Sequence, residues 1–289
     1  MIKKHRNMSF LAIKKREKSF MNIQKNTFLI TGASDGIGRA FAERLAAEGF
    51  DLVLVARRGA VLQDFATDLE AVHGIRARVI VADLSQVGAV DGVLDQTEGL
   101  PIGLVVAAAG FGSIGPFLEQ EGSGEAGMVD LNCRSVVELS HGFGARMSAQ
   151  GRGGIMLFGS LVGFHGAPLS ATYAATKGFG QSFAEGLGAE LRPRGVSVLS
   201  VAPGPIATGF ASRAGMQMSM SQRPETVARS ALAALGRRGT VRPGFLSKFL
   251  GWSLAMLPRW GRVRVTGLIM KGLVDAEARA DRTPVVVRT

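Results

Sequence analysis

The chain of 289 residues contains one cysteine and one tyrosine, and its apolar residues form no long run. The single cysteine, Cys133, excludes a disulfide framework within the chain and a zinc site built from cysteines, so we expect a reducing compartment. No segment reaches the about 18 consecutive apolar residues that span a bilayer. Residues 8–13 are too short for the apolar part of a secretory signal, and no small-residue cleavage site follows them. These absences indicate a cytoplasmic globular protein.

Basic residues are concentrated at the two ends of the chain. The formal net charge is +11, of which residues 1–25 carry +7, residues 237–289 carry +8 and residues 26–236 carry −4. Neither end contains a nucleic-acid-binding motif or aromatic residues interleaved with basic ones, so we expect no nucleic-acid partner. Attraction to anionic lipid headgroups is the better functional interpretation. For residues 1–23 we expect a disordered, solvated extension.

Short apolar runs alternate with segments of helical periodicity along most of the chain. This alternation predicts an α/β domain whose parallel sheet is covered by helices on both faces. The expected strands are residues 28–31, 51–56, 77–82, 104–108, 154–158 and 196–201. The expected helices are residues 37–46, 60–73, 87–97, 125–149 and 170–192.

A glycine-rich segment, residues 31–38, lies between the first expected strand and the first expected helix. Gly32, Gly36 and Gly38 permit a tight turn and a close approach of the backbone to a pyrophosphate. The helix that follows directs its positive amino end toward such phosphates. The spacing is G-x-x-x-G-x-G rather than the commoner G-x-G-x-x-G, and a plain strand–helix turn is the alternative. The position after the first strand favours a dinucleotide site.

The end of the second expected strand bears on the choice between the two nicotinamide cofactors. The strand ends in Ala56-Arg57-Arg58 and has no carboxylate to bind the ribose hydroxyls of NAD. Arg57 can pair with the 2′-phosphate of NADP through charge-assisted hydrogen bonds, and the Ser34 hydroxyl can add another. NADP is therefore favoured over NAD. Two arginines that are simply exposed are the alternative.

Tyr173 and Lys177 lie four residues apart, with Ser160 thirteen positions before the tyrosine. Residues at this spacing share one face of a helix. An adjacent cation favours phenolate and lowers the pKa of a tyrosine from about 10, toward the range in which general acid–base catalysis is efficient. Ser160 would then bind the oxygen on which the proton is exchanged. A surface tyrosine beside a solvated lysine is the alternative that this pair alone leaves open.

These motifs, taken together, resemble the short-chain dehydrogenase/reductase family over roughly residues 24–240. The elements that carry the resemblance are Thr-Gly-Ala-Ser-Asp-Gly-Ile-Gly at 31–38, Asp83, Ala-Ala-Gly at 108–110, Asn132, Ser160, Tyr173-x-x-x-Lys177, and Pro-Gly-Pro-Ile-Ala-Thr at 203–208. The resemblance implies one Rossmann-type domain, a doubly wound parallel sheet with helices on both faces. The family commonly has Asn-Asn-Ala-Gly where this chain has Ala107-Ala-Ala-Gly110, and we expect local repacking there.

The resemblance also implies a role for each matching position. Tyr173 would be the general acid or base, Lys177 would lower its pKa, Ser160 would hold the substrate oxygen, and Asn132 would position a water for proton relay. No metal is implied. The implied cofactor-binding residues are Gly32, Ser34, Asp35, Gly36, Ile37, Gly38, Arg57, Asp83, Leu84, Ala109, Gly110, Tyr173, Lys177, Pro203, Gly204, Ile206 and Thr208.

Residues 241–289 form a basic and apolar extension, in the part of the chain that sets substrate choice in the family. Residues 245–257 place Phe245, Phe249, Trp252 and Met256 near one helical face. Such a segment can lie on a membrane surface, which would place the protein on the inner face of a membrane. A lid over the active site is the equal alternative. The segment resembles C-terminal extensions of ketoacyl- and steroid-type reductases and favours an apolar substrate.

We therefore expect an NADP(H)-dependent oxidoreductase that interconverts a carbonyl and a secondary alcohol on a ketoacyl-, steroid- or lipid-like substrate. The alternatives are an NAD-dependent dehydrogenase of a small polar alcohol and a non-catalytic nucleotide-binding sensor or interaction protein. The resemblance suggests a homodimer or homotetramer. We expect His141 and His165 to be structural or substrate-lining residues.

Overall fold

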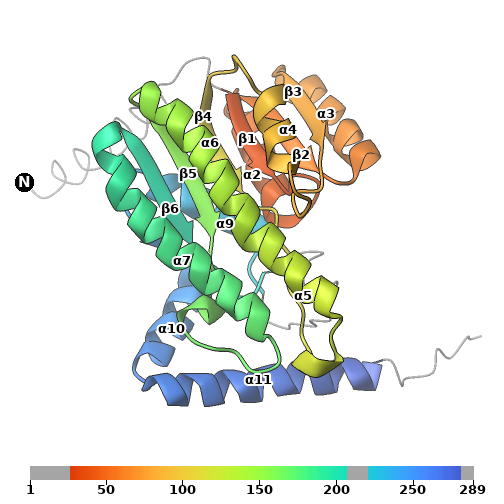
Figure 1. Ribbon diagram of the computed structural model, residues 1–289, viewed down its shortest axis with the longest axis vertical. Coiled ribbons are helices and arrows are strands. Elements are labelled where there is room, and N and C mark those ends of the chain that lie inside the picture. The colour runs from red at the N-terminus through yellow and green to blue at the C-terminus, as the bar shows by residue number, and fades with distance from the viewer. Residues whose placement is uncertain (1–26, 207–220, 281–289) are drawn as a thin grey trace, which may run out of the picture.

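The computed structural model describes residues 27–206 and 221–280. Within these residues, one parallel sheet of seven strands has the order β3-β2-β1-β4-β5-β6-β7 (Figure 1). The strands are β1 (Thr27–Thr31), β2 (Asp51–Ala56), β3 (Ala77–Val81), β4 (Ile102–Ala107), β5 (Gly153–Phe158), β6 (Val196–Val201) and β7 (Thr240–Val241). The expected α/β fold is confirmed.

Helices cover both faces of this sheet (Figure 1). The α-helices are α2 (Gly36–Ala47), α3 (Gly59–His73), α4 (Ala89–Gln96), α5 (Gly122–Val129), α6 (Ser135–Ala149), α7 (Ala171–Leu191), α9 (Pro224–Ala234), α10 (Gly244–Ala255) and α11 (Arg259–Ala280). Short 3-10 helices are η1 (Phe117–Glu119), η3 (Leu161–Phe164) and η4 (Arg192–Arg194), and η2 (Asp130–Arg134) is a π-helix.

The sheet separates two apolar cores. In β2, Leu52 and Leu54 join the core beneath α2, α3 and α9, whereas Val53 and Val55 join the core beneath α4, α6 and α7. Successive side chains of a strand point to opposite faces, so a strand between two helical layers must be apolar at every position. This requirement explains the continuous apolar runs of the sequence.

The strand order reverses beside β1, because β2 lies on one side of it and β4 on the other. The loops that leave the carboxyl ends of β1 and β4 therefore diverge. In open parallel sheets, this divergence creates the crevice in which ligands bind. The glycine-rich loop follows β1 and residues 108–110 follow β4, so both sequence motifs lie at this point.

Two features differ from the sequence-based expectation. The expected helix over residues 125–149 is instead α5, the π-helix η2 and α6, and Asn132 lies in the π-helical turn. A π-turn shifts the following helical face by one residue, which apolar periodicity does not reveal. Strand β7 was not expected, because two residues are too few to show the period of a strand.

The C-terminal helices α10 and α11 lie together at one end of the molecule, drawn in blue (Figure 1). Helix α10 contacts η3 and α9. No helix among the described residues is long and apolar enough to cross a membrane. The expected extension over residues 1–23 lies outside the described residues.

Candidate active site

The glycine-rich loop between β1 and α2 leaves no room for side chains at two of its glycines. A Cβ atom on Gly38 would lie 2.4 Å from the Gly32 carbonyl oxygen, and one on Gly32 would lie 3.0 Å from the Ala109 backbone. Gly32 and Gly36 have φ values of +66° and +52°, which favour glycine. The Asp35 side chain does not cap the first turn of α2. This bare loop at a helix amino end fits the pyrophosphate of a dinucleotide.

Arg58, rather than Arg57, is bonded to the glycine-rich loop. Its guanidinium donates to the Ser34 hydroxyl (3.1 Å) and to the Ser34 carbonyl oxygen (3.0 Å) and lies 3.8 Å from an Asp35 carboxylate oxygen. Arg57 points instead toward Asp83, at 3.9 Å. The sequence had shown two adjacent arginines, but only their directions in space distinguish them. Arg58 is thus a candidate cofactor residue that the sequence analysis missed.

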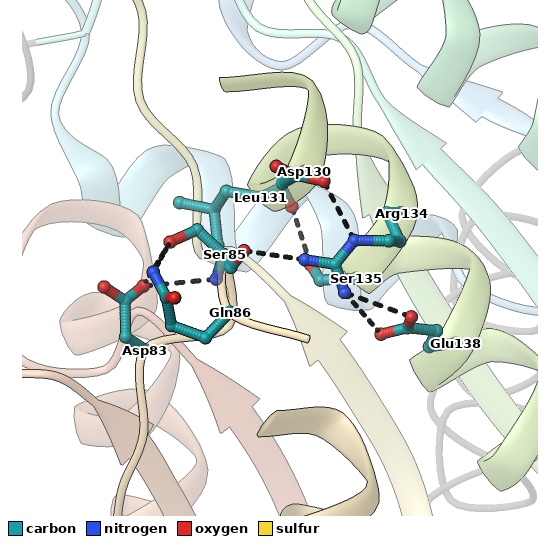
Figure 2. A network of polar contacts seen from close by, with 8 residues as sticks. All are labelled: Asp83, Ser85, Gln86, Asp130, Leu131, Arg134, Ser135 and Glu138. Atoms are coloured by element: carbon teal, nitrogen blue, oxygen red, sulfur yellow. Dashed lines mark hydrogen bonds and ion pairs between the residues drawn. The ribbon is translucent and has the colours of Figure 1, made fainter. Parts of the chain in front are cut away.

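The loop after β3 carries Asp83 and is fixed to the π-helix (Figure 2). Asp83 Oδ1 accepts hydrogen bonds from the Ser85 amide (3.1 Å) and hydroxyl (2.8 Å). Arg134 donates to the Ser85 carbonyl oxygen (2.6 Å) and forms ion pairs with Asp130 (2.9 Å) and Glu138 (3.1 Å). One arginine therefore connects the loop of Asp83, which is expected to bind cofactor, to the turn that contains Asn132.

Leu84, the other expected residue of this loop, is buried among apolar residues in the core beneath α4 and α6. Its neighbour Asp83 keeps about a third of its side chain exposed. The leucine therefore anchors the loop, while Asp83 is available to a ligand. The role of Arg134 in this connection was not expected, because a helical arginine four residues from an acidic residue on each side is typical of ordinary surface ion pairs.

Ser160, Tyr173 and Lys177 converge beyond the carboxyl end of β5. Ser160 lies two positions after the end of that strand, and the other two residues lie in the first turns of α7. Ser160 and Tyr173 are joined by a side-chain hydrogen bond. Lys177 Nζ lies 5.5 Å from the centre of the Tyr173 ring and donates to the Phe158 carbonyl oxygen at 3.1 Å. The three side chains expected to act together therefore meet.

The pKa of Tyr173 differs in direction from the expectation. Burial raises it to about 12, and the hydrogen bond with Ser160 lowers it by a smaller amount. Burial also lowers the pKa of Lys177 to about 8, against a smaller raising effect of Cys133. Burial disfavours the charged form of both groups and is the larger effect in each. At pH 7 the pair is a neutral phenol next to a protonated amine.

Asn132 uses its whole amide to join three segments. Its Oδ1 accepts from the Phe111 amide (3.2 Å), and its Nδ2 donates to the Phe111 carbonyl oxygen (2.9 Å) and to the Thr176 hydroxyl (3.0 Å). Thr176 in turn donates to the Tyr173 carbonyl oxygen at 2.9 Å. Asn132 is therefore linked to α7 through Thr176, a residue that no sequence motif indicated.

The segment after β4 lies against both the glycine-rich loop and this polar cluster. The Ala109 amide donates to the Thr31 hydroxyl at 3.0 Å. A Cβ atom on Gly110 would lie 2.9 Å from Asn132 Oδ1 and 3.6 Å from Lys177 Nζ. Gly110 thus marks the point where the expected cofactor loop and the expected catalytic residues meet. This arrangement forms with Ala107, Ala108 and Ala109 before Gly110, where the family commonly has Asn-Asn-Ala.

The loop after β6 is held from two sides. The Pro203 carbonyl oxygen accepts from the Leu161 amide (3.1 Å), and the Gly204 amide donates to Ser247 Oγ of α10 (2.7 Å). Ile206 forms a backbone bridge with Gln222. No sequence pattern connects Ser247 with this loop. Thr208, also expected to bind cofactor, lies outside the described residues.

Comparison with known proteins defines the class. Residues 26–219 match the sequence model of the short chain dehydrogenase family, so the chain belongs to that family. Very-long-chain 3-oxoacyl-CoA reductase from Anas platyrhynchos is 30% identical over 256 residues, which cover 87% of this chain and 81% of the relative. 7beta-Hydroxysteroid dehydrogenase from Collinsella aerofaciens is 29% identical over 229 residues, covering 76% and 86%.

Solved structures agree with this assignment. A structure of a 7beta-hydroxysteroid dehydrogenase has a TM-score of 0.78 and 27% identity, covering 83% of this chain and 96% of the other. A short-chain dehydrogenase from Sphingobium yanoikuyae in complex with NADPH has a TM-score of 0.71 and 31% identity, covering 80% and 93%. The protein is an oxidoreductase of the family, one that acts on alcohol and ketone groups.

Proposed function

We propose that the protein is an NADPH-dependent reductase that converts a ketone into a secondary alcohol on an apolar acyl or steroid-like substrate. The observation that carries the proposal is the hydrogen-bonded pair of Ser160 and Tyr173 beside Lys177. A phenol with a pKa near 12 is protonated at neutral pH. A general acid must hold its proton before the substrate arrives, although a pKa far above the operating pH makes that proton harder to give up.

In the proposed mechanism, the nicotinamide cofactor supplies a hydride when it is bound. Tyr173 donates its proton to the substrate oxygen as negative charge develops there. The Ser160 hydroxyl orients that oxygen, and the protonated Lys177 stabilises the phenolate that remains. Asn132 and Thr176 position the first turns of α7 through their hydrogen bonds to one another and to the Tyr173 backbone.

The preference for NADPH rests on charge at the end of β2. Arg57 lies beside the Asp83 loop. Arg58 lies beside the glycine-rich loop, where it contacts Ser34. A guanidinium can form two parallel bonds to a phosphate, whereas the ribose hydroxyls of NAD offer no charge to pair. The relative from Sphingobium yanoikuyae, solved with NADPH, supports the same preference.

The substrate class follows from the relatives and from the helices near the site. The relatives act on very-long-chain 3-oxoacyl-CoA and on hydroxysteroids, both of which present a carbonyl or hydroxyl on a large apolar body. In this chain, residues 161–168 after Ser160 contact α10 and α11. We infer that these elements border the substrate and that α11 partly covers it, as the lid hypothesis expected.

A direct test is NADPH oxidation measured over a panel of ketones that includes 3-oxoacyl thioesters, oxosteroids and small polar ketones. We expect turnover with the first two classes and a loss of about 100-fold or more in Tyr173→Phe, which keeps the ring and removes the proton. Binding of NADPH, followed by its fluorescence, should be retained in the variant. An unchanged rate in Tyr173→Phe would refute the mechanism, and turnover of small polar ketones alone would refute the substrate class.

A further inference from the structure

Helix α10 packs against the protein through its small side chains and exposes its large apolar ones. Ser247 is fully buried and accepts hydrogen bonds from the Gly204 amide and from Gln222 Nε2 (3.0 Å). On the opposite face, Phe245, Phe249 and Trp252 are 83%, 51% and 64% exposed. An ordinary surface helix has the reverse arrangement, with its apolar face toward the core. This helix therefore presents an apolar face that the described residues do not cover.

Helix α11 also exposes large apolar side chains. Trp260 is 71% exposed, and Leu268 and Ile269 are also exposed, whereas Thr266 and Met270 are buried on the other side of the helix. The buried side rests on the loop after η3, because Thr266 meets His165 and Gly267 lies against Pro168. Together with Met256, these exposed apolar residues of the two helices are here called the C-terminal apolar face: Phe245, Phe249, Trp252, Met256, Trp260, Leu268 and Ile269.

Charge identifies the partner of this face. Residues 244–274 contain five basic residues and no acidic one. The next carboxylate in the sequence is Asp275, near the carboxyl end of α11. Lys248, Arg259, Arg264 and Lys271 are exposed on the same helices. A basic helix with exposed tryptophan and phenylalanine has the composition of segments that lie in the interface of an anionic membrane.

We propose that the C-terminal apolar face binds the surface of a membrane that contains anionic phospholipid. The aromatic residues would enter the boundary between headgroups and acyl chains, and the flanking lysines and arginines would pair with lipid phosphates. A second copy of the chain is the less favourable occupant. In a two-fold dimer the same patch meets itself, so that the exposed lysines and arginines of one copy would face those of the other.

The position of the face connects the membrane to the site. Helix α10 holds the Gly204 loop through Ser247, and α11 holds the loop that follows Ser160 and η3. A third segment adds to the same region, because Gly115 and Ser113 bond to Leu169 and Ser170. Next to it, Phe117 and Leu118 of η1 are also exposed. If the proposed function holds, an apolar substrate dissolved in the bilayer would enter beside these loops.

Both tryptophans of the chain, Trp252 and Trp260, lie in the C-terminal apolar face. Their fluorescence therefore reports on this face alone, without any need for activity. With vesicles of phosphatidylserine and phosphatidylcholine, the full chain should show a blue shift of its emission and quenching by brominated lipid. Vesicles of pure phosphatidylcholine should give a much smaller change, and 0.5 M salt should weaken the response. No shift with anionic vesicles overturns the proposal.

Co-sedimentation with the same vesicles tests which residues are responsible. Phe245→Glu combined with Phe249→Glu should reduce binding at least tenfold, and Phe245→Ser with Phe249→Ser should reduce it without adding charge. The control is Val61→Glu with Val72→Glu on α3, which changes the net charge equally at two exposed apolar positions. Both pairs are exposed, so the fold should survive, as circular dichroism would verify.

Two outcomes of that experiment would contradict the proposal. Equal losses in the α10 and α3 variants would show that net charge, and not this face, controls binding. A change of oligomeric state in the α10 variant, seen by sedimentation velocity without vesicles, would identify the face as a contact between copies of the chain. If the α10 variant loses vesicle binding but retains NADPH oxidation, membrane binding can be lost without loss of catalysis, which supports a separate membrane-binding face.

Discussion

His165 Nε2 lies 2.7 Å from Thr266 Oγ1, and this contact joins the loop after η3 to the C-terminal helix α11. Both residues are almost fully buried. Burial lowers the pKa of His165, and the positive charges of Arg262 and Arg259 lower it further. The imidazole is therefore neutral in the folded protein. A contact between residues 101 positions apart thus holds α11 beside the candidate active site.

The first prediction concerns the pH dependence of this contact. A histidine whose pKa is lower in the folded state stabilises the fold above the unfolded value of about 6.5, and that stabilisation is lost as the pH falls below it. We expect the native chain to lose more stability between pH 7.5 and 5.5 than His165→Gln does. Thermal unfolding at both pH values measures this difference. Parallel curves for the two proteins would contradict it.

A second prediction concerns Lys177. Because burial lowers its pKa to about 8, the lysine loses its charge as the pH rises through that value, whereas Tyr173, with a pKa of about 12, stays protonated. The reductase rate should be constant from pH 6 to 7.5 and fall above pH 8. In Lys177→Arg the guanidinium stays charged, so any residual activity should lack this decline. A native profile that is flat to pH 10 would show that the lysine keeps its charge above pH 8, which contradicts this prediction.

A third prediction separates the two arginines after β2. Charge-assisted hydrogen bonds contribute about 1.5 to 3 kcal/mol, so Arg58→Ala should weaken NADPH binding by roughly 10- to 100-fold and leave NADH binding nearly unchanged. Arg57→Ala serves as the matched variant, since its guanidinium faces Asp83 instead of Ser34. Titration of both cofactors measures the ratio. An unchanged ratio in both variants would remove the basis for NADPH preference.

A fourth prediction concerns the glycine-rich loop. Gly38→Ala would place a methyl group 2.4 Å from the Gly32 carbonyl oxygen, so the backbone must move. We expect a loss of about 1 to 3 kcal/mol in the free energy of unfolding together with weakened cofactor binding. Gly92→Ala, in the interior of α4 with no atom within 4 Å of the added carbon, should be neutral or stabilising by up to about 1 kcal/mol. Urea denaturation compares the two.

The sequence predicted what depends on local spacing. The strand–turn–helix of the glycine-rich loop and the four-residue spacing of Tyr173 and Lys177 follow from backbone geometry alone, and the structure places them as expected. The continuous apolar strands likewise indicated a sheet covered on both faces. Each of these patterns spans only a few residues, so the sequence shows it without knowledge of distant contacts.

Only the tertiary structure decided what depends on direction and burial. The guanidinium that reaches Ser34 is that of Arg58, because the backbone after β2 turns it toward the loop. The pKa of Tyr173 rises because the fold removes it from water, which no spacing reveals. The exposed side of α10 is its aromatic side, because Ser247 must face Gly204. Sequence determines which groups are present, and the packing of distant segments determines which of them meet water, lipid or one another.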